Sequence, residues 1–434
     1  MKEFLKGVVI KILTLEAQIL IWRFKPYVIM VTGSVGKTST KDAVYTALNS
    51  FLPSVRKSQK SQNSDIGVPL TILNLNNAWS NPILWLWNIF FGLLKVIFTF
   101  NYPKYLILEV GADKPGDLAN LLNWIKPNMV VATIFPSLSV HVQFYKTPDD
   151  VIKEESLPAL EMPSDGILIL NDDDEKSAAL GKEFGDKVIT YGLTPRANVS
   201  SLGDEILYSQ IDGRSVPTGM KFAVSYGNNK VPFTINGAIG ITQIYPVLAG
   251  IASAIALGGK LQDLANVYDD YEVPRGRMCT IPAIKGAIII DDSYNSSPVA
   301  VDIALRTLKR VSGKRRIVAL GDMRELGSYA KDEHLKVGKL VAETADILIT
   351  VGILSRHIAE GALNNKMDEK NIYQFEDSEK AGKFLETILK EGDIVLVKGS
   401  QNTIFMERLV EEIMLHPEDK EKLLVRQESE WKSR

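Results

Sequence analysis

The run Gly33-Ser-Val-Gly-Lys-Thr-Ser39 contains residue types that can bind the phosphates of a nucleotide. It follows the apolar run Tyr27–Thr32 and precedes a helical pattern at Lys37–Leu48, so it lies where a strand leads into a helix. Backbone N–H groups at such a turn point toward phosphate oxygens. A lysine there reaches the terminal phosphates, and the following Thr hydroxyl can hold Mg²⁺. The spacing G-x-x-G-K-T is shorter than the general pattern, but it predicts a nucleotide site.

Two further side chains are candidates for holding a metal ion beside those phosphates. Glu109 ends the apolar run Tyr105–Glu109, and ligands in open α/β sheets bind at the carboxyl ends of the strands. Mg²⁺ favours carboxylates next to substrate phosphate. His141, one of only four histidines, follows the strand expected at Met129–Thr133. Both residues are predicted metal ligands, with a surface glutamate and a structural histidine as the alternatives.

A second polar group follows a strand in the other half of the chain. Asp291-Asp-Ser-Tyr-Asn-Ser-Ser-Pro298 comes after the run Ala287–Asp291, and Pro274-Arg-Gly-Arg277 precedes both. Arginine guanidinium groups bind phosphate or carboxylate with two parallel hydrogen bonds. The aspartates could also cap a helix that begins at Pro298. Alongside any such cap, the arginines indicate an anion-binding junction between two domains.

These segments belong to a chain in which strands alternate with helices. Continuous apolar runs between helical patterns indicate parallel sheets covered on both faces, which is an α/β fold. Further strands are expected at Gly166–Asn171, Arg316–Leu320, Ile347–Val351 and Asp393–Val397, a helical pattern at Tyr245–Leu257, and short antiparallel strands at Asn198–Ile235. We predict an N-terminal amphipathic helix (1–26), a central ATP-binding domain (27–272), a C-terminal α/β domain (273–415) and a charged tail (416–434).

The composition narrows the class of protein. The chain has 434 residues, enough for two or three domains, and its net charge of −2 provides no global attraction to nucleic acid. Cys279 is the only cysteine, which excludes a disulfide framework and a multi-cysteine zinc site and fits a reducing cytoplasm. Lys11 and Glu16 interrupt the N-terminal apolar run, and no small-residue cleavage site follows, which argues against a signal peptide.

Taken in order, the motifs resemble those of the Mur ligase family. The resemblance rests on Val31-Thr-Gly-Ser-Val-Gly-Lys-Thr-Ser-Thr40, Ser64-Asp-Ile-Gly-Val-Pro69, Leu108-Glu-Val-Gly-Ala112, Asp291-Asp-Ser-Tyr-Asn295, Leu320-Gly-Asp-Met-Arg-Glu-Leu-Gly327 and Leu396-Val-Lys-Gly-Ser400. It extends from about Tyr27 to Ile413. The segment ending at Gly327 favours the branch that adds D-alanyl-D-alanine to a cell-wall precursor.

The resemblance implies an ATP-dependent ligase that forms an amide bond through an acyl phosphate. It implies a C-terminal Rossmann-like domain that closes over a phosphate-loop ATPase domain, with ATP and Mg²⁺ as cofactors. The implied substrates are a small-molecule carboxylate and an amine, in the cytoplasm. By position it assigns ATP binding to Gly33, Ser34, Val35, Gly36, Lys37, Thr38, Ser39, Arg277, Asp292, Tyr294 and Asn295. It assigns catalysis to Lys37, Glu109, His141 and Arg277, and metal binding to Thr38, Glu109, His141 and Glu155.

Two departures from the family pattern concern the nucleotide site. The family usually has a carbamylated lysine where alignment from His141 places Glu155, which we interpret as a permanent carboxylate, with Lys153 as the alternative. The family's histidine and asparagine in a G-x-H-x-x-x-N segment are Thr242 and Pro246 here. Because proline cannot donate the hydrogen bond of an asparagine amide, adenine recognition is expected to differ at that position.

A third departure is at the start of the chain. Only about 30 residues precede Gly33, too few for the nucleotide-sugar domain that the family usually carries there. The resemblance therefore does not assure a UDP-linked acceptor.

An apolar insertion at 79–102 stands where the family has a short connection. Its core, Ile83–Phe100, places Asn88, Gly92, Lys95 and Thr99 on one helical face. A helix of this length is roughly 27 Å long, marginal for crossing a bilayer core of about 30 Å. With the N-terminal helix we expect a hairpin, packed on the central domain or on a partner, or else a peripheral contact (1–26 and 83–100) at the inner face of the cell membrane.

Three other functions are left open. The first is an amide ligase for a lipid-linked or other non-UDP carboxylate at the membrane. The second is a phosphate-loop ATPase that binds partners without ligating. Folate polyglutamylation is a weaker third.

Overall fold

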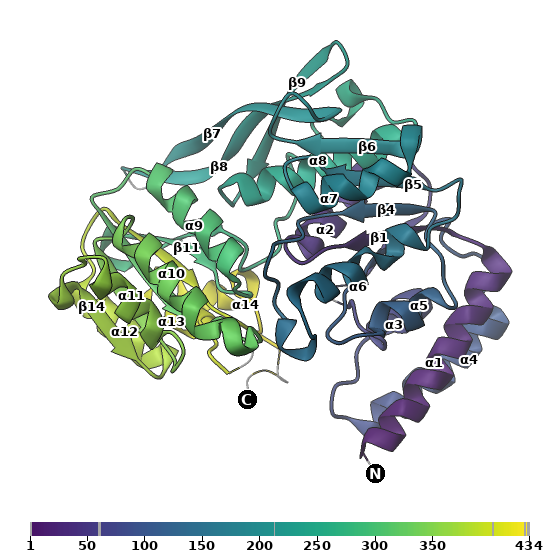
Figure 1. Ribbon diagram of the computed structural model, residues 1–434, viewed down its shortest axis with the longest axis horizontal. Coiled ribbons are helices and arrows are strands. Elements are labelled where there is room, and N and C mark those ends of the chain that lie inside the picture. The colour runs from purple at the N-terminus through teal and green to yellow at the C-terminus, as the bar shows by residue number, and fades with distance from the viewer. Residues whose placement is uncertain (1, 60–61, 212, 402, 429–430, 432–434) are drawn as a thin grey trace.

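The computed structural model describes residues 2–59, 62–211, 213–401, 403–428 and 431, which form two sheets and the helices around them (Figure 1). The first sheet has nine strands in the order β2 (Val55–Lys57), β3 (Tyr105–Glu109), β1 (Tyr27–Thr32), β4 (Met129–Ala132), β5 (Ile167–Asn171), β6 (Val188–Gly192), β7 (Val199–Ile211), β8 (Arg214–Tyr226) and β9 (Asn229–Asn236). Neighbours from β2 to β7 are parallel, and β7, β8 and β9 are antiparallel. The long hairpin β7–β8 reaches toward the second sheet (Figure 1).

Both faces of the parallel part are covered by helices, as the apolar runs predict. Ile29 and Val31 of β1 belong to a core shared with α2 (Lys37–Asn49) and α8 (Ile241–Ala256). Val28 and Met30, which point the other way, belong to a core with α3 (Gly67–Leu73) and α5 (Asp117–Leu122). The helices α6 (Pro148–Leu160) and α7 (Glu175–Leu180) complete the cover. Every position of β1 after Tyr27 is therefore buried, so the strand shows no alternation of polar and apolar residues.

The second sheet has the strand order β10 (Cys279–Pro282), β11 (Ile288–Asp292), β15 (Asp393–Lys398), β12 (Arg315–Gly321), β13 (Ile347–Val351) and β14 (Ile372–Phe375). All neighbours are parallel except β10 and β11. Its helices are α9 (Pro298–Arg310), α10 (Ala330–Ala342), α11 (Arg356–Asn364), α12 (Ser378–Ile388) and α13 (Glu407–Ile413). The expected parallel strands and the α/β fold class are confirmed. The antiparallel strands β7, β8 and β9 lie where they were expected but are long rather than short, with 13, 13 and 8 residues. The domain boundaries remain a prediction.

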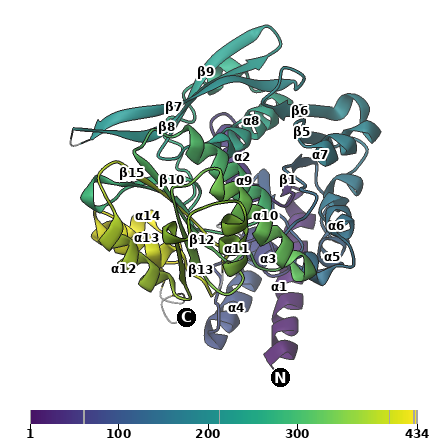
Figure 2. The same ribbon diagram turned by 60° about the vertical axis from the view of Figure 1, so that its left-hand side comes forward.

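Helices α1 (Lys2–Phe24) and α4 (Pro82–Phe98) lie side by side and project beyond the rest of the molecule in both views (Figure 1, Figure 2). The inner side of α1 is buried through Leu13, Ala17 and Leu20. Near the ends of both helices, Arg23 Nη1 donates to the Val96 carbonyl at 3.0 Å. Glu16 of α1 faces Gly92 of α4, and Arg23 reaches Val96, so the contacts advance along both helices together and the two helices run in the same direction. The predicted hairpin is therefore wrong.

The charged tail is less peripheral than its composition suggests. It contains a 3-10 turn at Pro417–Asp419 and the short helix α14 (Lys420–Leu423). Leu424 is then buried in the core of the second sheet, and Arg426 Nη1 lies 2.7 Å from Glu407 Oε2 with both side chains buried. This part of the tail packs as an integral part of the C-terminal unit.

Candidate active site

The phosphate loop follows β1 where the strand order of the sheet reverses, between β3 on one side and β4 on the other. Gly33 has φ +116° and Gly36 has φ +89°, conformations that favour glycine. A Cβ at Gly33 would also lie 2.2 Å from Thr133 Oγ1. Since α2 begins at Lys37, the first N–H groups of this helix have no intrahelical partner and can bind an anion. The Lys37 ammonium donates to the Gly33 carbonyl, so it lies against the loop.

Glu109 lies beside this loop, at the end of β3. Its side chain is buried, and Thr38 Oγ1 donates to its Oε1 at 3.1 Å, while Lys41 Nζ is 3.8 Å from its Oε2. Oε2 has no hydrogen-bond partner among the described residues. Burial raises the pKa of the Glu109 carboxyl, and the charges of Lys41, Lys37 and Arg277 oppose that rise. A hydroxyl and a buried carboxylate next to a phosphate loop are a donor set that fits Mg²⁺.

Glu155 lies on α6, which packs against the same loop. Its buried carboxylate accepts from Ser34 Oγ, and its Oε1 is 3.5 Å from Lys37 Nζ. The neighbouring Glu154 accepts from the Leu118 N–H at 2.9 Å at the start of α5. Lys153 points away, with 79 % of its side chain exposed and Asp150 at 3.8 Å. Glu155, rather than Lys153, therefore faces the phosphate loop.

His141 is turned toward the second sheet. Its Nδ1 is 2.6 Å from Glu325 Oε2, and its Nε2 is 3.6 Å from Asp113 Oδ1. No three His, Cys, Asp or Glu side chains come close enough to form a metal site within the described part of the chain. The four predicted ligands are therefore arranged separately: Thr38 pairs with Glu109, Glu155 pairs with the loop, and His141 pairs with Glu325.

The predicted residues of the C-terminal unit gather around the end of β11. The Arg277 guanidinium stacks on the Tyr294 ring at 4.0 Å. Asp292 Oδ2 accepts from Lys398 Nζ at 2.6 Å, and Asn295 Oδ1 accepts from the Ser296 N–H at 2.9 Å. Arg277 is also held against α8, the helix that packs on α2 directly after the phosphate loop.

Four side chains of this region are missing from the predicted site. Lys41 lies one helical turn after Lys37, so its place beside Glu109 could have been inferred from spacing. Lys398 and Glu325 belong to motifs that carry the family resemblance, but their partners Asp292 and His141 are far away in the sequence. Arg426 donates to the Tyr294 carbonyl from the tail, and nothing in the sequence pattern marks it.

The segment Gly240–Pro246, which departs from the family pattern, forms the start of α8. Gln243 Nε2 donates to the Arg277 carbonyl at 2.8 Å, which links α8 to the junction. Thr242 Oγ1 is buried without a hydrogen-bond partner among the described residues. Pro246 lies inside the helix, where it supplies no N–H. The expectation that adenine recognition differs here stays a prediction.

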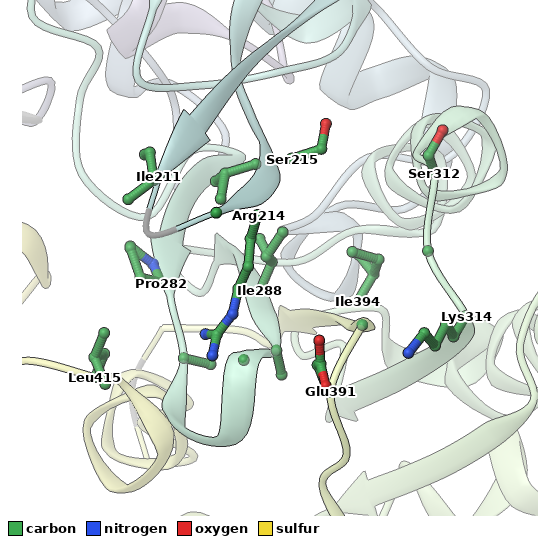
Figure 3. A pocket seen from close by; sticks show the side chains of 17 residues that line it. Ile211, Arg214, Ser215, Pro282, Ile288, Ser312, Lys314, Glu391, Ile394 and Leu415 are labelled. Carbon is green, nitrogen blue, oxygen red and sulfur yellow. The ribbon is translucent and has the colours of Figure 1, made fainter.

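A cavity of about 340 Å³ lies elsewhere, between the β7–β8 hairpin and the edge of the second sheet (Figure 3). Its lining includes Arg214, Ile288, Lys314 and Glu391. None of the predicted site residues contributes to it, so it is separate from the phosphate loop.

The fold and the site define a phosphate-loop nucleotide-binding protein whose second α/β domain faces the loop. Residues 31–254 match the Mur ligase middle domain, and residues 276–401 match the Mur ligase, glutamate ligase domain. The chain therefore belongs to the Mur ligase family and is an ATP-dependent ligase that joins a carboxylate to an amine.

Similar proteins agree with this assignment. The UDP-N-acetylmuramoyl-tripeptide–D-alanyl-D-alanine ligase of Buchnera aphidicola is 26 % identical over 393 residues, covering 89 % of this chain and 75 % of the relative. The Bacillus subtilis enzyme of that name is 24 % identical over 392 residues, covering 90 % and 76 %.

Solved structures share the fold. MurF from Acinetobacter baumannii has a TM-score of 0.74 at 21 % identity, covering 92 % of this chain and 79 % of that one. MurF ligase from Thermotoga maritima, solved in complex with ADP, has a TM-score of 0.70 at 23 % identity, covering 95 % and 84 %.

Proposed function

We propose that this ligase adds D-alanyl-D-alanine, or another amino acid or peptide, to a carboxylate of a cell-wall peptide precursor. The support comes from its relatives in Buchnera aphidicola and Bacillus subtilis, which are named as ligases of a UDP-linked tripeptide and D-alanyl-D-alanine. A location in the cytoplasm, on the inner side of the cell membrane, belongs to the same proposal.

The reaction would proceed in two steps. In the first, a carboxylate oxygen of the precursor attacks the γ-phosphorus of ATP, and the bond from that phosphorus to the bridging oxygen breaks, releasing ADP. In the second, the amine nitrogen attacks the carbonyl carbon of the acyl phosphate, phosphate leaves, and the nitrogen loses a proton. Water would compete with the amine in the second step, so the site has to exclude it.

The residues around the loop have distinct parts in this proposal. The turn Gly33–Ser39 would hold the nucleotide phosphates through backbone N–H groups, and Lys37 would offset charge on the transferred phosphoryl group. Thr38 and Glu109 would hold Mg²⁺, and His141 and Glu155 would bind a second metal ion or orient its ligands. When bound, Mg²⁺ supplies positive charge next to the phosphate oxygens.

A contact between the two α/β units carries this proposal. His141 Nδ1 from the first unit meets Glu325 Oε2 from the second at 2.6 Å, and the Gln143 N–H donates to the Glu325 carbonyl at 3.3 Å. A bare phosphate-loop ATPase needs no second unit at this place. A ligase does, because the second unit positions the amine and shields the acyl phosphate from water.

The test is phosphate release from ATP by the full chain with three acceptors: a UDP-linked tripeptide, its lipid-linked counterpart and the free peptide. Each is assayed with and without D-alanyl-D-alanine. We expect release only when acceptor and amine are both present, together with an amide product detected by mass spectrometry. Release that ignores the amine would overturn the ligation proposed here.

A second candidate acceptor is a lipid-linked carboxylate at the membrane. The observation that favours it is the exposed apolar surface of α1 and α4, which lies at the start of β1 and β3. Preference for the lipid-linked acceptor in the same assay would select this candidate. The match to a Mur ligase C-terminal domain argues against an ATPase that binds partners without ligating.

A further inference from the structure

Helix α4 is oriented with its polar side inward. Asn88 Nδ2 donates to the Asn76 carbonyl at 2.9 Å, and Lys95 Nζ donates to the Asn74 carbonyl at 2.8 Å. Gly92 faces α1, where a Cβ would lie 2.0 Å from Glu16 Oε2. The polar face recognised in the sequence therefore contacts the protein, which is the reverse of an ordinary surface helix.

The opposite side of α4 is apolar and exposed. Nine of the seventeen side chains of this helix are apolar and 45–67 % exposed. Ile83, Leu86, Phe90, Leu93 and Ile97 follow one another at intervals of three and four residues, so they form one continuous face. Single exposed apolar residues need no explanation, but a continuous face of this kind marks a binding surface.

Helix α1 extends this surface. Leu5, Val8, Leu15, Ile19 and Trp22 are exposed and recur at helical spacing on the side of α1 that points away from the core. Trp22 on α1 and Trp87 on α4 are 76 % and 50 % exposed. Tryptophan favours the boundary between apolar chains and water in a bilayer.

Charge identifies what covers this face. Residues 5–25 and 82–104 contain six basic residues and one acidic residue, in a chain of net charge −2. The acidic residue, Glu16, is buried, whereas Lys6, Lys11, Arg23, Lys25 and Lys104 are exposed. The exposed charge that the described side chains place on and next to the two helices is therefore positive, and it complements an anionic surface.

We propose that the exposed apolar face of α1 and α4 binds the surface of an anionic phospholipid bilayer, with both helices lying in the plane of the interface. No helix within the described residues has the length and apolar character needed to cross a bilayer. A second copy of the chain is a poorer fit, because a twofold contact would bring two sets of these basic residues together. The binding does not depend on which substrates the ligase joins.

The experiment is flotation of the full chain with vesicles of phosphatidylglycerol and phosphatidylcholine, compared with vesicles of phosphatidylcholine alone. We expect binding to the anionic vesicles to be about tenfold or more stronger, and to weaken with salt. Substituting Trp87→Ser together with Phe90→Ser should reduce binding at least about tenfold, because two exposed aromatic side chains are lost. The matched control is Ile353→Ser with Leu363→Ser, which removes two apolar side chains of 71 % and 40 % exposure elsewhere.

Charge variants separate the two contributions. Lys6→Gln with Lys11→Gln should weaken binding to the anionic vesicles about fivefold per charge and leave binding to phosphatidylcholine unchanged. The proposal is overturned if the parent does not float with anionic vesicles, or floats equally with both kinds. It is also overturned if the Trp87 and Phe90 variant floats like the parent. Light scattering without vesicles tests the other occupant. If the parent is a dimer and the Trp87 and Phe90 variant is a monomer, the face binds a second copy of the chain instead.

Discussion

Both the phosphate loop and the α1–α4 pair bury glutamates, but in opposite surroundings. Glu109 and Glu155 lie beside Lys41 and Lys37, at 3.8 Å and 3.5 Å, and each also accepts from a hydroxyl. Glu16 is buried between α1 and α4, and its Oε2 has no hydrogen-bond partner among the described residues. The first region stabilises charged side chains through ion pairs and hydrogen bonds. The second packs two largely apolar helices together and gives its carboxylate no such partner.

This difference separates what each region can do. A buried carboxylate beside ammonium groups and a helix N-terminus can take part in binding a metal ion and phosphate. A buried carboxylate without such partners only makes the packing of two helices depend on its protonation. Changing a charge should therefore alter catalysis in the first region and stability in the second.

The largest effect is expected from Lys37→Ala. It removes the ammonium from the phosphate loop, and loss of a preorganised charge at a reacting group costs about 10²- to 10³-fold in rate. Ligation, measured as phosphate release with acceptor and amine, should fall by that factor, while circular dichroism stays unchanged. The control is Lys126→Ala, which breaks the exposed pair with Glu161. Turnover within about threefold of the parent would remove Lys37 from the reaction.

Glu155→Gln keeps the shape of the side chain and removes its charge. We expect activity to fall about 10- to 100-fold, the usual cost of losing a group that orients a metal site or its partners. Glu154→Gln is the matched control, because that side chain faces α5 and its amide can still accept from Leu118. The parent should need no bicarbonate after CO₂ is stripped. Rescue by bicarbonate would contradict a permanent carboxylate at this position.

Glu325→Ala is expected to have an intermediate effect of about tenfold on activity. The substitution frees His141, whose Nδ1 is 2.6 Å from Glu325 Oε2 and which links the two α/β units. The loss should appear in kcat more than in the KM for ATP, because the contact orients groups and does not hold the nucleotide. The control is Glu360→Ala, which breaks a similar but exposed pair with His357. If the two substitutions reduce activity equally, Glu325 has no positioning role.

The sequence predicted the parts of the site that depend on neighbours in the chain. The strand at Tyr27–Thr32 and the phosphate loop are continuous segments, and their pattern follows from burial on both faces and from turn geometry. Glu109 was recognisable because it ends a strand, and the ends of parallel strands share one edge of the sheet.

Pairs that form across the chain could not be predicted in this way. Lys398 pairs with Asp292, which is 106 residues away in the sequence, and Arg426 donates to Tyr294, which is 132 residues away. The polar face of α4 was visible as a spacing, but amphipathicity alone does not say which face meets the protein. The direction of α1 relative to α4 is set by contacts between residues more than 70 positions apart, which the pattern within either helix does not reveal, so the hairpin was predicted wrongly.

The smallest effect on activity is expected from Glu16→Gln in the α1–α4 pair, where the substitution should change stability instead. Burial raises the pKa of Glu16 to about 7 from its usual 4.5, so the folded protein holds this proton over a range in which the unfolded chain has lost it. The free energy of unfolding therefore falls as pH rises from about 4.5 to about 7. Above pH 7 the cost of burying the charged carboxylate no longer changes with pH. Glutamine keeps the size without the charge, and should raise the free energy of unfolding at pH 8 by about 1–3 kcal/mol, the upper end corresponding to the full change in pKa. At pH 4.5 the two proteins should be nearly equal in stability, because Glu16 of the parent is then protonated in the fold.

Urea unfolding at both pH values measures this difference in stability, with Glu161→Gln as the exposed control. A variant that is less stable than the parent at pH 8 would show that the Glu16 carboxylate has a favourable partner, and would end the contrast with Glu109 and Glu155.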